Sequence, residues 1–88
     1  DDLALGVLFE CQRAAIDVPR KMGICGFNDL EMMRVAFPPL TSIRTHRYDI
    51  GRRAVGMVLG RLAGEDVGPP TVDVGFDLKI RESTAGPR

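Results

Sequence analysis

The fold of this chain is decided by the stretch Lys21-Met22-Gly23-Ile24-Cys25-Gly26-Phe27-Asn28-Asp29. The first seven of these residues form a short, mostly apolar run between turn-forming residues, which predicts a buried parallel strand over 21–27. Asn28 and Asp29 stand where that strand ends. Ligands of open α/β sheets bind outside the carboxyl ends of the strands, so both side chains are candidates for a ligand site. They can also cap a short helix over 30–35, because Asn and Asp are favoured caps.

The segments around this stretch alternate between helix and strand. Residue periodicity predicts, in chain order, helix 2–15, strand 21–27, short helix 30–35, strand 40–45, helix 47–63 and strand 71–81. Pro19 and Pro38-Pro39 separate neighbouring elements, since proline lacks the backbone donor that a helix needs. The polar residues 82–88 are expected to form a loose tail. The expected class is α/β with about three strands.

The first helix carries more apolar surface than a single buried face needs. One face has apolar residues at 4-3-4 spacing, namely Ala4, Leu8, Cys11 and Ala15. Leu5 and Phe9 add a second apolar strip beside it, with Leu8 at the border. Either the second strip meets another chain, or the helix is wedged deeply into a large core.

Composition excludes some classes of function. With 12 basic and 12 acidic residues among 88, the chain has no net charge with which to grip a polyanion such as DNA. No apolar run approaches the ~20 residues that span a bilayer, and no signal peptide is visible. Cys11 and Cys25 lie in apolar surroundings without CxxC spacing and are expected to be buried free thiols of a reduced, cytoplasmic protein.

Common catalytic motifs are absent from the sequence. The chain has no P-loop, no GxSxG and no HExxH motif, and Asp73 and Asp77 lie on one expected strand among apolar residues. His46 is the single histidine, and no serine or cysteine is paired with it by spacing. We therefore expect neither an enzyme, nor a metal site, nor a cofactor.

Several motifs along the chain resemble one known family. They are Asp1-Asp2-Leu3-Ala4-Leu5-Gly6, Val18-Pro19, Gly26-Phe27-Asn28-Asp29, Phe37-Pro38-Pro39-Leu40-Thr41-Ser42-Ile43, Arg47-Tyr48-Asp49-Ile50-Gly51-Arg52-Arg53-Ala54 and Arg81-Glu82-Ser83-Thr84. In order and spacing they resemble the lactose-repressor/galactose-repressor family of bacterial transcription regulators. The resemblance implies the C-terminal part of a two-lobed, periplasmic-binding-protein-like core, with parallel sheets flanked by helices. It places residues 1–43 in the C-terminal lobe and 44–72 in the N-terminal lobe with a crossover. Residues 73–88 would form the final strand and tail.

The resemblance also implies an effector site. Asn28 matches a family position, commonly an aspartate, that hydrogen-bonds the effector, and Asp29 lies beside it. Arg47 and Ile50 match positions that face the effector from the other lobe. Residues around Asn28 and Arg47 look most like the gluconate-repressor branch, whose effectors are sugar acids, and an arginine is a preferred partner for a carboxylate. Arg47 can instead form a surface pair with Asp49 or Glu31.

The implied partners follow from the same family. The first helix resembles one that pairs across a homodimer interface, which would place Leu5, Leu8 and Phe9 there. DNA would be bound only through a helix-turn-helix outside this chain. The rival interpretations are a periplasmic sugar-binding protein of the same fold and, from another class, a small α/β enzyme.

Overall fold

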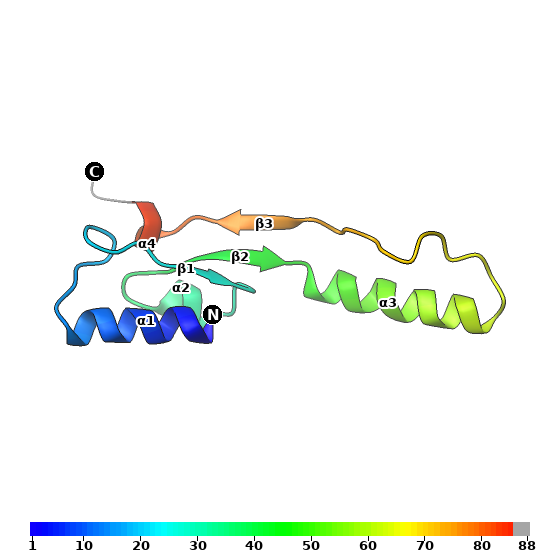
Figure 1. Cartoon of the computed structure of the whole chain (residues 1–88), viewed down its shortest axis with the longest axis horizontal. Helices are drawn as coiled ribbons and strands as arrows, with labels where there is room; N and C mark the ends of the chain where they lie inside the picture. Colours follow the sequence, from blue (N-terminus) through cyan, green and yellow to red (C-terminus); the bar gives the residue numbers. More distant parts are fainter. Residues whose placement is uncertain (86–88) are drawn as a thin grey trace. The chain divides into compact units, whose positions relative to one another are not determined.

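The computed structural model describes residues 1–85, which fall into two compact units. The first unit holds Asp1–Thr45 together with the residues from Asp77 onward, and the second unit holds His46–Phe76. The elements, labelled in Figure 1, are α1 (Asp2–Arg13), β1 (Cys25–Phe27), α2 (Met32–Val35), β2 (Thr41–Thr45), α3 (Arg47–Leu62), β3 (Phe76–Lys79) and α4 (Glu82–Ala85). The order of elements predicted from the sequence is confirmed, and α4 is added at its end.

The sheet of the first unit is built on one parallel pair. β1 runs parallel to β2, with Cys25 opposite Thr41 and Phe27 opposite Ile43, and the strand order is β1-β2-β3. The arrows of β2 and β3 point in opposite directions in Figure 1. The predicted α/β class with three strands is therefore confirmed.

The core of the first unit lies between α1 and the sheet. It consists of Ala4, Leu5, Leu8, Cys11, Ile24, Met33 and Leu40, all less than a tenth exposed. α1 approaches β1 closely at Gly26, where an added Cβ would lie 2.4 Å from Asp1 Oδ1 and 3.2 Å from Met33 Sδ. Glycine suits this position because a Cβ would displace the carboxylate of Asp1 at the start of α1.

Two expectations for the strands were wrong. β1 begins only at Cys25, and both Cys25 and Phe27 are exposed while Gly26 between them is buried, so the thiol of Cys25 is not a core group. Alternate residues of a strand point to opposite faces, and in this chain only the Gly26 face is covered. β3 was expected to bury one apolar face, but Phe76, Leu78 and Ile80 are 53–68% exposed.

The expected loose tail was also wrong over residues 82–85, which form α4. Ser83 is fully buried, its N–H donates to Pro39 O at 3.0 Å, and its carbonyl accepts from Ile24 N at 3.2 Å. The backbone of this polar segment is thus bonded to the residues that precede β1 and β2. The remainder of the expected tail, 86–88, lies outside the described residues.

The second unit is a long helix followed by an irregular loop. Gly60 is buried in α3, where an added Cβ would lie 2.7 Å from Val67 Cγ1, so this glycine permits the loop to approach the helix. Gly51 and Gly56 have open space around them, so close packing explains only one of the three helical glycines. Val55, Val58, Leu59 and Leu62 are exposed on α3. Within residues 1–85, no helix combines the length and the apolar content needed to cross a membrane.

Candidate functional site

The candidate site begins at the turn that follows β1. Asn28 has φ 98° and Asp29 has φ 52°, so both adopt left-handed backbone conformations. Residues with a Cβ rarely adopt this region, and Asn and Asp enter it more readily than others because their short polar side chains bond locally. The residue types at the end of β1 are therefore suited to this sharp turn.

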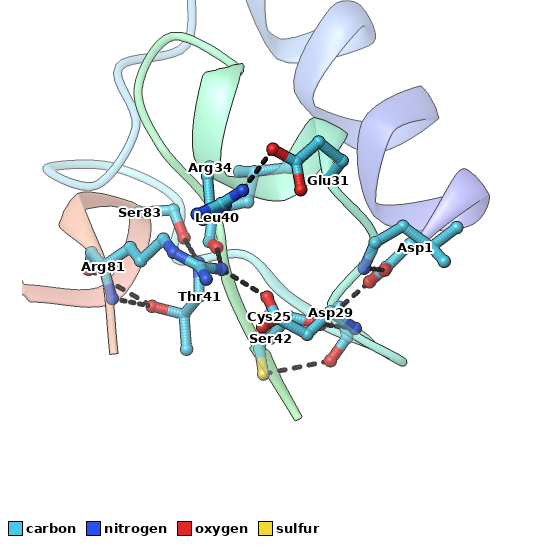
Figure 2. A network of polar contacts seen from close by, with 12 residues as sticks. Asp1, Cys25, Asp29, Glu31, Arg34, Leu40, Thr41, Ser42, Arg81 and Ser83 are labelled. Atoms are coloured by element: carbon cyan, nitrogen blue, oxygen red, sulfur yellow. Dashed lines mark hydrogen bonds and ion pairs between the residues drawn. The ribbon is translucent and has the colours of Figure 1, made fainter. Parts of the chain in front are cut away.

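Every backbone N–H of the turn 28–30 is hydrogen-bonded. Asn28 N donates to Ile43 O at 2.8 Å, Asp29 N donates to Ser42 Oγ at 3.0 Å, and Leu30 N donates to Asp1 Oδ2 at 2.5 Å. Ser42 Oγ in turn donates to Asp1 Oδ1 at 2.9 Å (Figure 2). The turn is thus fastened to β2 on one side and to the start of α1 on the other.

The start of α2 excludes one of the two interpretations of Asn28 and Asp29, that they cap this helix. Helix α2 begins at Met32 with Glu31 as its cap residue, so neither Asn28 nor Asp29 caps it. The side chain of Asn28 is half-buried, and its Oδ1 accepts a hydrogen bond from Thr45 Oγ1 at 3.1 Å. An amide can both donate and accept, which suits it to a hydroxyl-bearing ligand at the carboxyl end of β1.

The carboxylate of Asp29 is bound by an arginine from the end of the chain. Arg81 Nη1 donates to Asp29 Oδ1 at 2.7 Å, and the two side chains are only 15% and 8% exposed. This hydrogen bond holds the pKa of Asp29 below its usual value, against the raising effect of burial, with smaller help from the charges of Arg81, Arg44 and Lys79. Asp29 was expected among the effector ligands; its Oδ1 is engaged with Arg81, and its contact with an effector stays a prediction.

A cluster of hydroxyl groups lies behind this ion pair. Thr41 Oγ1 accepts from Arg81 N at 2.8 Å and lies 2.5 Å from Thr84 Oγ1. Ser83 Oγ accepts from Thr41 N at 2.8 Å and donates to Ile24 O at 2.6 Å. Figure 2 shows Thr41 and Ser83 of this cluster near Arg81, together with the Arg81–Asp29 pair. In the sequence, Arg81 and Ser83 stand out only as parts of a motif, because their partners lie about forty residues or more away along the chain.

The remaining two expected effector residues lie in the second unit. Arg47 is the first residue of α3 and is exposed; Ile50, three residues later on the same helical face, is 46% exposed. Asp49 pairs with Arg52 at 2.8 Å and with Arg53 at 3.0 Å. Glu31 pairs with Arg34. Asp49 and Glu31 were considered as surface partners of Arg47; each pairs with an arginine three or four residues further along the chain, and a pair with Arg47 stays an open alternative.

The expected dimer strip on α1 was wrong in part. Leu5 is 7% exposed and Leu8 is 1% exposed, and both belong to the core of this chain. The helix buries a wider face than a single 4-3-4 stripe, because Ile24, Met33 and Leu40 belong to the same core cluster as its apolar residues. Phe9 is 57% exposed, and its contact with a second chain stays a prediction.

Open depressions lie beside α3 in the second unit. One is lined by Arg53, Gly56, Met57, Val67 and Val72. Its lining is mainly apolar and includes none of the expected effector residues. Among residues 1–85, no three His, Cys, Asp or Glu side chains are placed to hold a metal ion.

The comparisons with known proteins agree on one kind of relative. Residues 1–84 match the family described as periplasmic binding protein-like domain. The HTH-type transcriptional regulator GntR of Pseudomonas aeruginosa is 46% identical over 84 residues, which make up 96% of this chain and 24% of that protein. The HTH-type transcriptional repressor CytR of Escherichia coli is 37% identical over 84 residues, or 96% of this chain and 25% of the repressor.

Solved structures give the same result. The transcription regulator GntR from Chromobacterium violaceum superposes with a TM-score of 0.87 at 42% identity, covering 98% of this chain and 32% of its own. A LacI family transcriptional regulator from Arthrobacter sp. FB24, in complex with lactose, superposes with a TM-score of 0.78 at 27% identity, covering 96% of this chain and 32% of its own. The chain spans about a quarter of the length of the curated relatives it matches.

Proposed function

We propose a function for this chain on the basis of its family. The chain belongs to the periplasmic binding protein-like family and, within it, to the transcriptional regulators of the lactose-repressor (LacI) type. In our proposal it forms part of the effector-binding core of such a regulator, in the gluconate-repressor branch. The effector is a sugar or sugar acid, and DNA is bound by a helix-turn-helix elsewhere in the regulator. A periplasmic sugar-binding protein would share the fold, but the relatives at 37–46% identity are transcription regulators.

The turn after β1 supports a ligand site in the first unit. It stands at the carboxyl end of a parallel strand, and its backbone is held rigidly by the bonds from Asn28 to Leu30. We assign the effector contact there to Asn28. Asp29, beside it, also supports the turn, because its Oδ1 accepts a hydrogen bond from Arg81.

The start of α3 supports an anionic ligand in the second unit. A helix N-terminus has backbone N–H groups without intrahelical partners and a positive dipole end, which together favour a negative group. Arg47 lies there and is exposed, and its guanidinium can bind a carboxylate through two parallel hydrogen bonds. Ile50, on the same face, would supply an apolar contact. The single observation that carries the sugar-acid assignment is this arginine in the first turn of α3.

Calorimetry on the full-length regulator tests the assignment. Wild type should bind gluconate more tightly than neutral glucose, and Arg47→Ala should weaken gluconate binding by about 10- to 100-fold, since a charged hydrogen bond contributes about 1.5–3 kcal/mol. Binding of glucose should change little. Arg53→Ala is the matched control, because Arg53 is an exposed arginine of the same helix that pairs with Asp49.

The opposite results would be informative. Equal losses for gluconate and glucose would mean that Arg47 does not recognise a carboxylate. Preference of the wild type for glucose would reject the sugar-acid class.

A further inference from the structure

The turn that carries Asn28 is held from the far end of the chain by a single arginine. Arg81 Nη1 donates both to Asp29 Oδ1 at 2.7 Å and to Leu40 O at 2.8 Å. One guanidinium nitrogen therefore joins the turn after β1 to the residue before β2. Because the two side chains are largely shielded from water, this pair is screened far less than the exposed pairs of α1, α2 and α3.

Arg81 is itself fixed in place. Its backbone N–H donates to Thr41 Oγ1, and its backbone carbonyl accepts a hydrogen bond from the same hydroxyl at 3.2 Å. Ser83, two residues later, is anchored between Ile24 and Thr41 and has no exposed surface. The backbone of Arg81 is thus bonded to the first residue of β2. The guanidinium therefore has little freedom to shift if the turn at Asn28 and Asp29 moves.

The turn depends on such support because its conformation is costly. A residue with a Cβ in the left-handed region costs of order 1–3 kcal/mol, and it persists only where the surroundings hold it. Two consecutive residues, Asn28 and Asp29, adopt positive φ here. Without Arg81, the carboxylate of Asp29 would be left largely buried without its cation, and the turn would relax toward solvent.

We propose that Arg81 is a positioning residue of the effector site: it acts through Asp29 to hold Asn28 in its binding orientation, without touching the effector. This inference rests on the proposed function, in which Asn28 contacts the effector. The residues that support the site then include the segment 81–84, which is hydrogen-bonded to Ile24 and Thr41 at the amino ends of β1 and β2. Effector affinity then depends on a residue that lies 52 positions from Asp29 in the sequence.

The first test needs no effector. Amide hydrogen exchange of the ligand-free, full-length regulator is measured for wild type and Arg81→Gln. The amides of Asn28 and Asp29 should exchange about 10-fold faster or more in the variant, because local opening of the turn becomes easier, while the amides of α1 stay unchanged. Arg34→Gln is the matched control. It removes an arginine–carboxylate pair of the same unit in which the arginine side chain is 59% exposed, and it should leave hydrogen exchange in the turn unchanged.

The second test uses gluconate as the probe in calorimetry, at a temperature where every variant is fully folded. Arg81→Gln and Asp29→Asn should each weaken binding by about 10-fold, as supporting residues around a site commonly do. The double variant should lose no more than either single one, because both changes remove the same link. A merely structural pair would lower the unfolding midpoint and leave gluconate affinity intact.

The outcomes separate this inference from the proposed function. Unchanged exchange at Asn28 and Asp29 in Arg81→Gln overturns the inference, and so does an unchanged gluconate affinity or a loss that adds in the double variant. If the wild type does not bind gluconate, the proposed effector class is wrong, and the exchange result alone decides whether Arg81 holds the turn. If Arg81→Gln does not fold, Arg81→Lys replaces it in both tests, with a smaller loss expected because a lysine keeps the charge but not the fork of donors.

Discussion

At the scale of single residues, the site consists of polar side chains whose charge state and hydrogen bonding depend on their surroundings. Asp29 is nearly buried and accepts a hydrogen bond from Arg81, whereas Asp17 of the same unit is exposed. That bond favours the charged carboxylate and lowers its pKa from the usual 3.8, although burial acts in the other direction. The folded structure therefore favours the charged form of Asp29.

The lowered pKa of Asp29 predicts acid sensitivity. Because the pKa is lower in the folded than in the unfolded protein, the stabilisation is fully present above about pH 4 and is lost as pH falls through 3.8 toward the folded pKa. Asp29→Asn should lower stability in urea by about 1.5–3 kcal/mol at pH 6, and this difference from wild type should shrink below pH 4. Asp17→Asn is the control. A difference that stays constant from pH 6 to pH 3 would contradict the assignment.

At the scale of elements, long-range hydrogen bonds rather than local propensity define α4. Glu82, Ser83, Thr84 and Ala85 carry no apolar stripe, and in isolation a helix of this length would not persist. The segment is ordered because Ser83 bonds to Ile24 and Thr41 with its side chain and to Pro39 and Ile24 with its backbone. A polar tetrapeptide thereby joins the starts of two strands.

Replacing Ser83 by alanine tests this role of α4. The substitution removes a buried acceptor from Thr41 N and a buried donor from Ile24 O. Each unsatisfied group costs about 1–3 kcal/mol, so Ser83→Ala should destabilise the protein by about 2–4 kcal/mol in urea unfolding. Thr71→Ala, which removes an exposed hydroxyl, should change stability by less than about 0.5 kcal/mol. Equal effects of the two substitutions would show that Ser83 does not hold the strands.

At the scale of the whole molecule, each unit leaves much apolar surface exposed. In the first unit Leu3 and Phe9 of α1 are more than half exposed, on the two flanks of its buried face. In the second unit Leu59 and Leu62 of α3 are 61% and 79% exposed. Apolar surface of this kind is typical of proteins that pack against further chain or against a second copy.

Self-association through α1 is the prediction at this scale. Introducing a charge at an apolar interface leaves it buried without a partner, so Phe9→Glu should weaken dimerisation of the full-length regulator by at least about 10-fold. Sedimentation equilibrium measures this, and circular dichroism should show unchanged helix content. Leu3→Glu, on the other flank of α1, is the matched comparison. If Leu3→Glu dissociates the dimer and Phe9→Glu does not, the interface lies on the Leu3 flank of α1 and the prediction is contradicted.

Residue patterns alone determined the order of six elements, the approximate bounds of α1, β2 and α3, and most of one buried face of α1. Apolar spacing, β-branched runs and prolines act through neighbours along the chain, so they are visible without the fold. The position of Asn28 and Asp29 at the end of β1 was also predicted in this way, because polar residues directly follow an apolar strand. The motif match pointed to the right family across the chain.

The tertiary structure decided which side chains are engaged with one another. Leu5 lies in the core, Cys25 is exposed, and Ser83 is fully buried, all against expectation. The pair between Arg81 and Asp29 joins residues 52 positions apart, and no local pattern signals it. Burial and long-range hydrogen bonds are properties of neighbours in space, and which residues become neighbours is settled only when the strands pair and the helices pack on them.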